Sequence, residues 1–491
     1  MPVHWLLSAA SAALASGTST QTRLMHAIAA NGGGATVGIS SAGGVRGLVA
    51  TRPAAAGDVL LEVPLSCCIS SFCDDPDEVV SRIAAVEPPE STRTASWNVQ
   101  LTCSVLLHQQ DASSPAAPLL DSWPEAPPLP LFCTPADLSH ASDDVFKSRV
   151  REQQQTAEAQ RRFALRDAEK AGDVALATVL ADSAAYLDAF ALVSSRALQI
   201  FPPPPVGARH VLVPLLDLAN HADAPTATFF FSPTRGGMMR LHATRELAAG
   251  DEVTICYAEG VGSGHFAQYY GFVPHDHRHN CVEIELATLM AGEGWSEERL
   301  REHGVLHGCE LHELYAPTPA PALLATLGAL LAGDWVTRYY GWKADVPADV
   351  DLLFSPGADD DVAEAVFRCV RRGAAAAAAQ AEAAAAFRVD VGDAAADVAP
   401  RSAAAQSVLT EVGQSALTTL RALEVSAGRL EAAFALASAA GESDGGEASA
   451  RARSLLEAAF AEIAPTAAPI GPERLEAYAA REWDWGTSQY T

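Results

Sequence analysis

The sequence predicts an α+β protein: a β-rich core with a helical insertion, followed by an all-α C-terminal domain. Short apolar runs separated by turn residues fill 32–70 and 210–286, a pattern typical of strands. From about 91 to 200, apolar residues recur every three or four positions, as they do in helices. Beyond about 295 the chain is Ala-rich and periodic, which favours long helices. The alternating strand–helix order of a doubly wound sheet is missing.

Composition limits the classes of function. The 491 residues are enough for about two to four domains. A hydrophobic content of 49% and a charged content of 19% indicate a globular protein. The formal net charge of −27 argues against nucleic-acid binding and is compatible with a basic protein partner. No apolar run reaches the ~18 residues of a membrane span, so no membrane association is expected.

The N-terminal segment 1–22 forms a separate leader. It contains "WLLSAASAALASGTST", and no acidic residue occurs before Asp58. This composition fits an organelle transit peptide, and the short apolar stretch also fits a signal peptide, although a basic n-region is missing. The preferred interpretation is a helix or frayed leader of an Ala-rich protein, and a targeting segment is the alternative.

The nine cysteines include no CxxC pair, so the spacing of a zinc site is missing. Their odd number and low density predict reduced thiols inside a cell, in the cytoplasm, nucleus or chloroplast. The alternating histidines of "HDHRH" (275–279) could share one face of a strand, but a solvated loop is the preferred interpretation. We therefore expect no metal site.

A glycine-rich segment, "GISSAGGVRG" (38–47), follows the leader. It lacks the Lys-Ser/Thr end of a P-loop, because Val45 and Arg46 stand in that place. It also lacks the spacing of a dinucleotide fingerprint. Two interpretations stay open: a turn between strands, or a loop whose backbone amides approach a nucleotide-like ligand.

The stretch "HVLVPLLDLANH" (210–221) is an apolar run that leads into Asp217, Asn220 and His221. These polar residues could cap a structural turn. Alternatively, the Asn amide and the imidazole offer hydrogen-bond donors and acceptors to a ligand.

A third segment, "AAGDEVTICYAEGVGSGHFAQYYGFVP" (248–274), carries a turn, an apolar strand and several tyrosines. Tyr257 ends the strand, and Tyr270 follows thirteen positions later. Single aromatic residues at strand ends usually belong to a core. A pair of tyrosines could also line a narrow aromatic channel with phenol hydroxyls.

Five segments in this order resemble the SET-domain protein methyltransferases, above all the Rubisco large-subunit lysine methyltransferase (LSMT) subfamily. They are "NGGGATVGISSAGGVRGLVATRPAAAGDVLLEVP", "SSRAL", "LVPLLDLANH", "AAGDEVTICYAEG" and "YYGFVP", spread over 31–274. The resemblance implies a SET domain over 23–290 with its helical insertion at about 91–200. It also implies that an α-helical domain over 295–491 docks a protein substrate.

The same resemblance implies S-adenosyl-L-methionine as the cofactor. By it, Gly44, Val45 and Arg46 bind the cofactor through their backbone, and Asn220 and His221 hold it from the other side.

The resemblance also assigns the substrate side of the site. Arg196, in "SSRAL", and Asp217 shape that side, Tyr257 is the catalytic residue, and Tyr270 borders a lysine channel. Methyl transfer in such a site needs a neutral, aligned amine but no metal ion.

The chain departs from the subfamily at 262–265, where Gly-Ser-Gly-His replaces the usual Ser-Asn-Ala-Glu. Leu198 stands where actin-histidine methyltransferases carry an asparagine, which favours lysine as the target. The cysteine-rich flanks of histone-type SET enzymes are absent. We therefore expect a monomeric protein-lysine N-methyltransferase that acts on a non-histone protein. The alternatives are a non-catalytic binding module and a protein-histidine methyltransferase.

Overall fold

The computed structural model divides into two compact units that do not follow chain order. The first contains 1–127, 152–259 and 467–491, and the second contains 128–151 and 260–466. The residues that the structure describes are 20–41, 45–72, 86–111, 113–139, 141, 143–201, 208–233, 236–258, 261–275, 277, 280–302, 311–315, 323–324, 327, 331, 360–391, 400–439 and 445–463. The predicted leader lies outside them, apart from the start of a helix over 20–30.

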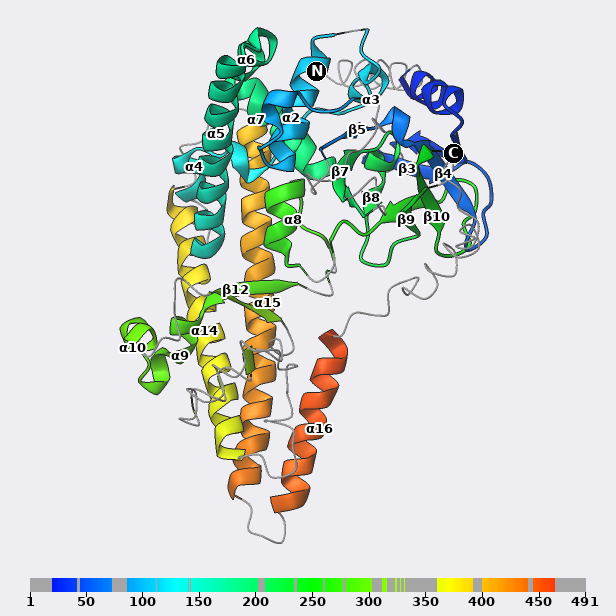
Figure 1. Cartoon of the computed structure of the whole chain (residues 1–491). Helices are drawn as coiled ribbons and strands as arrows, with labels where there is room; N and C mark the ends of the chain where they lie inside the picture. The colour runs from blue at the N-terminus through cyan, green and yellow to red at the C-terminus, as the bar shows by residue number, and fades with distance from the viewer. Residues whose placement is uncertain are drawn as a thin grey trace, which may run out of the picture. The chain divides into compact units, whose positions relative to one another are not determined.

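One sheet of the first unit has four antiparallel strands in the order β1-β4-β10-β9 (Figure 1). They are β1 (Gly34–Ala35), β4 (Val59–Pro64), β10 (Met238–Ala243) and β9 (Ala227–Ser232). Every residue of β10 is buried, as expected of a strand flanked on both sides. Segments far apart in sequence therefore share one core.

A second sheet carries two of the predicted site residues, Asn220 and His221. Its order is β2-β3-β11-β8, and only the β11–β8 pair is parallel. The strands are β2 (Val37–Ser40), β3 (Gly47–Ala50), β11 (Glu252–Ile255) and β8 (Asn220–His221). A three-stranded sheet, β5-β7-β6, completes the unit with Ile69–Ser70, Arg209–Leu212 and Leu198–Ile200. The predicted β-rich core is confirmed.

Helices of the predicted insertion pack together within the first unit. They are α2 (Trp97–Gln109), α6 (Val174–Ala181) and α7 (Ser183–Arg196). Asp173 and Asp182 cap the last two by accepting backbone N–H bonds. Because α7 ends at Arg196, it fixes where that arginine enters the site. Taken singly, none of the described helices is long and apolar enough to cross a membrane, although α6 and α7, bent by 94°, pass that test together.

The remaining part of the insertion belongs to the second unit. It comprises 128–151, with α4 (Pro135–Ser139) and the first turns of α5 (Asp144–Ala171). These turns pack against α8 (Ser263–Tyr270) and the start of α15 (Pro400–Ala439) through a cluster of buried apolar side chains: Cys133, Leu138, Ala141, Phe146, Val150, Ala267, Ala405, Val408, Leu409 and Val412.

Three long helices dominate the second unit: α14 (Asp360–Val391), α15 (Pro400–Ala439) and α16 (Gly445–Ile463). In Figure 1, α14 and α15 lie side by side. The helical prediction is confirmed, with one addition. β12 (Cys281–Glu285) pairs antiparallel with β13 (Leu311–Tyr315), so a strand lies where only helices were expected. Buried Val282 and Ile284 alternate along β12, as in a half-buried strand that needs a partner.

Small side chains bring α14 close to its neighbours. Ala374 and Ala378, in the alanine run, are fully buried, and Phe367 stacks on Phe434 of α15 at 5.8 Å between ring centroids. A Cβ at Gly373 would lie 2.5 Å from Leu289 Cδ2, so only glycine fits there without movement. Packing explains why this segment is so poor in large residues.

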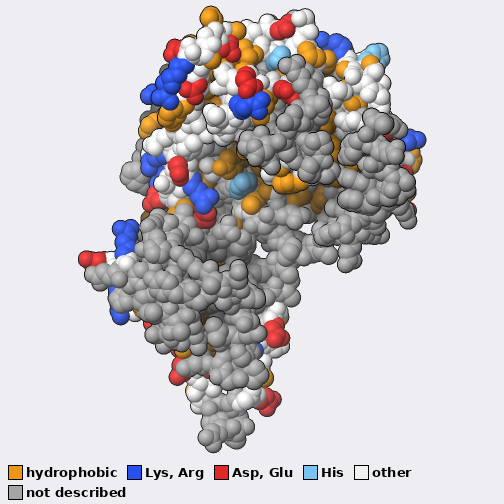
Figure 2. Space-filling view, viewed as in Figure 1, with side chains coloured by type: hydrophobic (Ala, Val, Ile, Leu, Met, Phe, Trp, Pro, Cys, Tyr) orange, Lys and Arg blue, Asp and Glu red, His pale blue; other side chains and the backbone are white. Residues whose placement is uncertain are grey.

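Surface charge is mixed. On the face drawn in Figure 2, basic side chains lie among acidic ones and form no continuous basic patch in the part that is described. His277 of "HDHRH" is half-buried, bonds to Val261 O at 2.6 Å and lies edge-on to Phe266. This residue therefore departs from the solvated loop that the sequence suggested.

Candidate functional site

Strand β8 holds Asn220 and His221 beside the end of β11. Asn220 pairs with Thr254, and His221 pairs with Ile255. Tyr257 follows two residues beyond the end of β11. Within the first unit, the parallel pairing therefore brings Tyr257 to the adjacent residues Asn220 and His221, which lie more than thirty positions earlier in the sequence.

The His221 ring is engaged at both nitrogens. Its Nδ1 accepts the backbone N–H of Tyr257 at 3.2 Å, and its Nε2 lies 3.1 Å from Asp223 Oδ1. Because Nδ1 acts as an acceptor, the proton of the neutral ring sits on Nε2 and is donated to the carboxylate. The His221 side chain therefore holds the backbone of Tyr257 in place. The backbone of His221, rather than its side chain, can bind a ligand.

The Tyr257 hydroxyl is also fixed. It donates to the backbone carbonyl of Ala219 at 2.7 Å, and its ring lies 5.4 Å from the His221 ring, centroid to centroid. With the hydrogen directed to Ala219, the oxygen lone pairs are set to accept a hydrogen bond. This geometry suits a phenol that orients an amine.

Asp217 does not cap a turn. Its side chain is fully buried, and its Oδ2 accepts the indole N–H of Trp123 at 2.6 Å. Arg196 lies 3.6 Å from the same oxygen and donates to the Asp217 backbone carbonyl at 2.7 Å. Burial raises the pKa of Asp217, while Arg196, Trp123 and Arg46 act in the opposite direction. Asp217 therefore belongs to a buried polar cluster.

A tight turn directs Asp217 inward. β7 ends at Leu212, so the strand stops well before Asp217. Leu215 then adopts φ 65° and ψ −46°, and Leu216 N–H bonds to Pro214 O at 2.8 Å, which is the rarer form of γ-turn. Leu215 is the one non-glycine residue with positive φ among those described, at a cost of about 1–3 kcal/mol.

Arg46 connects the glycine-rich segment to the insertion. Its guanidinium donates to the backbone carbonyl of Ser122, next to Trp123. Burial lowers the pKa of Arg46, Arg196 lowers it further, and Asp217 raises it. Three buried polar atoms of this cluster have no hydrogen-bond partner among the described residues: Arg46 Nε, Arg196 Nε and Asp217 Oδ1. We call Arg46, Trp123, Arg196 and Asp217 the Asp217 cluster.

Gly47 is an element of the site that sequence reasoning missed. A Cβ there would lie 2.4 Å from Asn220 Nδ2. The same Nδ2 donates to Glu252 Oε1 at 2.8 Å. The glycine therefore lets the backbone of β3 meet the Asn220 amide directly.

Trp123 and Asp223 were also missed. Trp123 lies in the Pro-rich loop "PLLDSWPEAPPLP", where its indole N–H was a signal because a buried indole needs an acceptor. Asp223 follows His221 by two positions, a spacing that could have suggested the pair.

Three further predicted site residues are not among the contacts described above. Gly44 is outside the described residues. Val45 is 66% exposed. Tyr270 ends α8 in the second unit, where its ring lies 5.8 Å from Phe266 and 6.4 Å from Phe272. The functional roles of all the site residues stay predictions.

Comparison with known proteins agrees with this architecture. The family model described as SET domain matches residues 45–258. SET domain-containing protein 8 of Schizosaccharomyces pombe is 38% identical over 64 residues, which are 13% of this chain and 14% of that protein. The matched stretch is thus far shorter than two thirds of that relative.

Solved structures of Rubisco LSMT share the fold. The SET domain of LSMT bound to lysine and AdoHcy gives a TM-score of 0.57 at 15% identity, covering 85% of this chain and 92% of that one. Rubisco LSMT bound to AdoMet gives 0.53 at 15% identity, covering 84% and 93%. These findings confirm the resemblance seen in the sequence: residues 45–258 match the SET domain model, and the chain shares the fold of Rubisco LSMT.

Proposed function

We propose that this protein is an S-adenosylmethionine-dependent protein-lysine N-methyltransferase that acts on a non-histone protein. The observation that carries the proposal is the Tyr257 hydroxyl, held by Ala219 O beside the Asn220–His221 strand. In addition, the similar LSMT structures contain lysine, methyllysine, AdoMet or AdoHcy.

The residues present fit this cofactor. A Cβ at Gly47 would collide with the Asn220 amide, so the glycine keeps that amide in place beside the backbone of β3. The backbone of Arg46 and His221 and the amide oxygen of Asn220 would hold the polar edges of the cofactor. Bound there, S-adenosylmethionine would supply a methyl group on a sulfonium.

The chain itself would orient the substrate amine and favour its neutral form. A lysine amine attacks only when it is neutral, and removal from water lowers its pKa. Tyr257 would accept a hydrogen bond from the amine and so align its lone pair, which is worth several kcal/mol when the geometry is fixed in advance. The Asp217 cluster would form the polar wall behind the substrate.

Lysine is preferred to histidine as the target because of Leu198. This apolar residue begins β6, two positions after Arg196. It offers no hydrogen bond to an imidazole. The protein-histidine methyltransferase therefore remains the less supported alternative.

The first test is transfer of label from methyl-labelled cofactor to a lysate of the source cells, followed by mass spectrometry of the modified peptides. We expect methyllysine, and we expect the label to disappear with Asn220→Ala. Asn31→Ala is the matched control, because Asn31 is exposed in the same unit and bonds to Ala27 O. Equal labelling by wild type and Asn220→Ala would refute the proposal, and methylhistidine would redirect it.

A second test separates binding from turnover. Tyr257→Phe should keep the affinity for S-adenosylhomocysteine in calorimetry but lower turnover about 10²-fold, since it removes one preorganised hydrogen-bonding group. Tyr186→Phe is the control, because the buried Tyr186 hydroxyl has no hydrogen-bond partner among the residues that the structure describes. If Tyr257→Phe weakened binding and turnover equally, Tyr257 would be structural. Failure of the wild type to bind cofactor would instead favour a non-catalytic binding module.

A further inference from the structure

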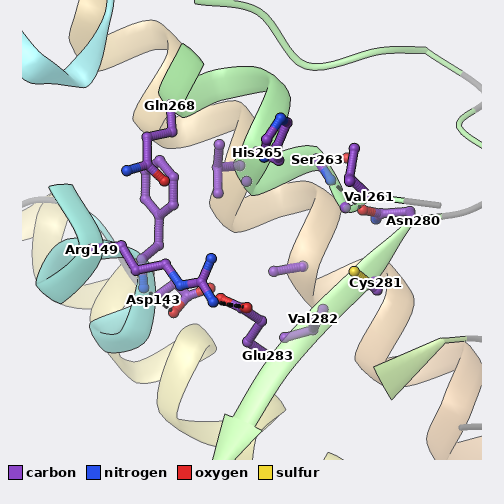
Figure 3. A pocket seen from close by; sticks show the side chains of 15 residues that line it. Asp143, Arg149, Val261, Ser263, His265, Gln268, Asn280, Cys281, Val282 and Glu283 are labelled. Carbon is purple, nitrogen blue, oxygen red and sulfur yellow. Dashed lines mark hydrogen bonds and ion pairs between the residues drawn. The ribbon is translucent and has the colours of Figure 1, made fainter. Parts of the chain in front are cut away.

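A polar pocket of about 80 Å³ lies within the second unit, among the start of α5, the start of α8, β12 and α15 (Figure 3). It includes the 262–265 segment in which the chain departs from the LSMT pattern. None of the residues assigned to the cofactor or to methyl transfer lines it. The pocket is therefore a feature that the proposed chemistry leaves unexplained.

Hydrogen bonds fix one wall of the pocket. The Asn280 side chain accepts the Ser263 backbone N–H at 2.9 Å and donates to Ser415 Oγ and Thr419 Oγ1 at 2.8 and 2.6 Å. It thereby joins the start of α8 to α15. A Cβ at Gly262 would lie 2.5 Å from Cys281 O, so glycine is needed where this segment meets β12. The wall is preformed.

The lining carries an excess of negative charge. Arg149 and Glu283 form an ion pair across one side, and Figure 3 shows them pointing toward each other. Asp143 carries the remaining negative charge of the lining; it accepts the Phe146 backbone N–H at 2.9 Å as the cap of α5, and the Lys147 charge also acts on it. Burial raises the pKa of Asp143. A cation in the pocket would offset this desolvation.

Gln268 supplies a second polar group. The residue is 5% exposed and lines the pocket, yet its side-chain amide makes no hydrogen bond to any other described residue. The Gln268 amide atoms are not among the described buried polar atoms that lack a partner, so they are open to the pocket space. A ligand in the pocket can therefore bond to them.

The rest of the lining is apolar. The Phe146 ring and the side chains of Val412 and Ala416 face the same space. An aromatic face and aliphatic groups suit the stem of a long side chain, and an aromatic face also attracts a guanidinium. The pocket thus combines a carboxylate, an amide oxygen and an apolar wall.

We propose that this pocket binds an arginine side chain of the protein substrate, at a residue other than the methylated lysine. A guanidinium presents five planar donors that match a carboxylate and an amide oxygen, and it stacks on aromatic rings. The net charge of −27 also favours a basic partner. The description of the partner as a substrate rests on the proposed function, whereas binding of the arginine side chain does not.

The test uses the full chain with methyl-labelled valines, because Val261, Val282 and Val412 line the pocket. The probe is N-acetyl-arginine amide, and N-acetyl-citrulline amide is its uncharged counterpart. We expect saturable shifts of these valine methyl signals with the arginine probe and affinity at least about tenfold weaker for citrulline. No saturable shift, or equal affinity for the two probes, would overturn the proposal.

Two substitutions make the test site-specific. Asp143→Asn removes the charge but keeps a good helix cap, and should weaken the probe about tenfold. Asp144→Asn changes the net charge equally outside the pocket, where Asp144 pairs with Lys147, and should leave affinity unchanged. Equal weakening by the two substitutions would mean that the net charge of the protein attracts the probe, and that the pocket does not. If Asp143→Asn does not fold, Gln268→Met decides: unchanged affinity there overturns the assignment.

These measurements need neither cofactor nor turnover. If the arginine probe binds but no methyl transfer is found, the pocket stands and the proposed function fails. If methyl transfer is found but the probe does not bind, the proposed function stands and the arginine pocket fails.

Discussion

The two units achieve stability in different ways. In the first, the Asp217 cluster gathers two arginines and an indole around a buried carboxyl group. In the second, α14 and α15 pack through alanine, leucine and phenylalanine side chains, with ion pairs such as Arg371–Glu431 at the edge. Apolar packing spreads its free energy over many contacts. A buried charge cluster depends on each member, since loss of one partner leaves another charge unsatisfied.

Removal of one carboxylate from each unit should show the largest contrast. Asp217→Ala leaves Arg196 buried without its partner and takes the acceptor from Trp123, so we expect a loss of about 3–5 kcal/mol in the free energy of unfolding. Glu431→Ala breaks a partly exposed pair on α15 and should cost about 1 kcal/mol or less. Urea unfolding of the full chain measures both. Similar losses for the two variants would contradict the distinction between the units.

The charge of Asp217 should also give the first unit a specific pH dependence. Because burial raises its pKa in the folded state, the native protein holds a proton that the unfolded chain has lost. Its contribution to stability should therefore fall as pH rises from about 3.9, the ordinary Asp value, through the raised pKa, by at most about 1.4 kcal/mol per pH unit. Asp217→Asn keeps the acceptor for Trp123 and should lack this dependence. A stability difference between wild type and Asp217→Asn that stays constant with pH would show that the folded-state pKa is not raised.

The contrast between apolar packing and buried polar clusters also explains which features the sequence could predict. Long periodic segments such as α15 bury a stripe of apolar residues, and this pattern is visible without the structure. The strands of the β-rich core were visible as short apolar runs for the same reason. β13 was missed because its pairing with β12 is a long-range choice that local pattern does not encode.

For the site, the order of motifs led to Asn220, His221 and Tyr257, but not to what each one touches. The role of the His221 ring depends on Asp223 and on a backbone N–H, and the environment of Asp217 depends on Trp123, 94 positions earlier. Hydrogen bonds between distant residues leave no periodicity in the sequence. The γ-turn at Leu215 is equally hidden, because leucine gives no signal for positive φ.

Arg46 should affect ligand binding as well as the stability of the Asp217 cluster. Arg46→Met removes the hydrogen bond from the glycine-rich segment to Ser122 O and the charge beside Asp217. If that segment holds the cofactor, affinity for S-adenosylhomocysteine should fall about tenfold in calorimetry, the value of one hydrogen bond from a charged group.

Arg52→Met is the matched control for Arg46, since it makes the same charge change at an exposed position of the same unit. It should leave affinity unchanged. Equal weakening by both variants would mean that the effect comes from net charge, and the tether to Ser122 would then have no role in binding.

The smallest expected effect concerns the second unit. Replacement of two helix glycines by alanine should change the stability of the protein in opposite directions. In a helix interior, Gly→Ala contributes up to about 1 kcal/mol through propensity. At Gly428 the nearest neighbour of a new Cβ is Arg371 Cδ at 3.2 Å, part of a flexible side chain that can move, so Gly428→Ala should stabilise the protein.

At Gly373 the neighbour is Leu289 Cδ2 at 2.5 Å, in a core where Leu289 is 1% exposed. Overpacking there costs about 1–3 kcal/mol, which exceeds the propensity gain, so Gly373→Ala should destabilise. Thermal unfolding of the two variants measures the sign; if both stabilised, the contact between α14 and Leu289 would be looser than the structure shows, and apolar packing would tolerate change even at its closest point.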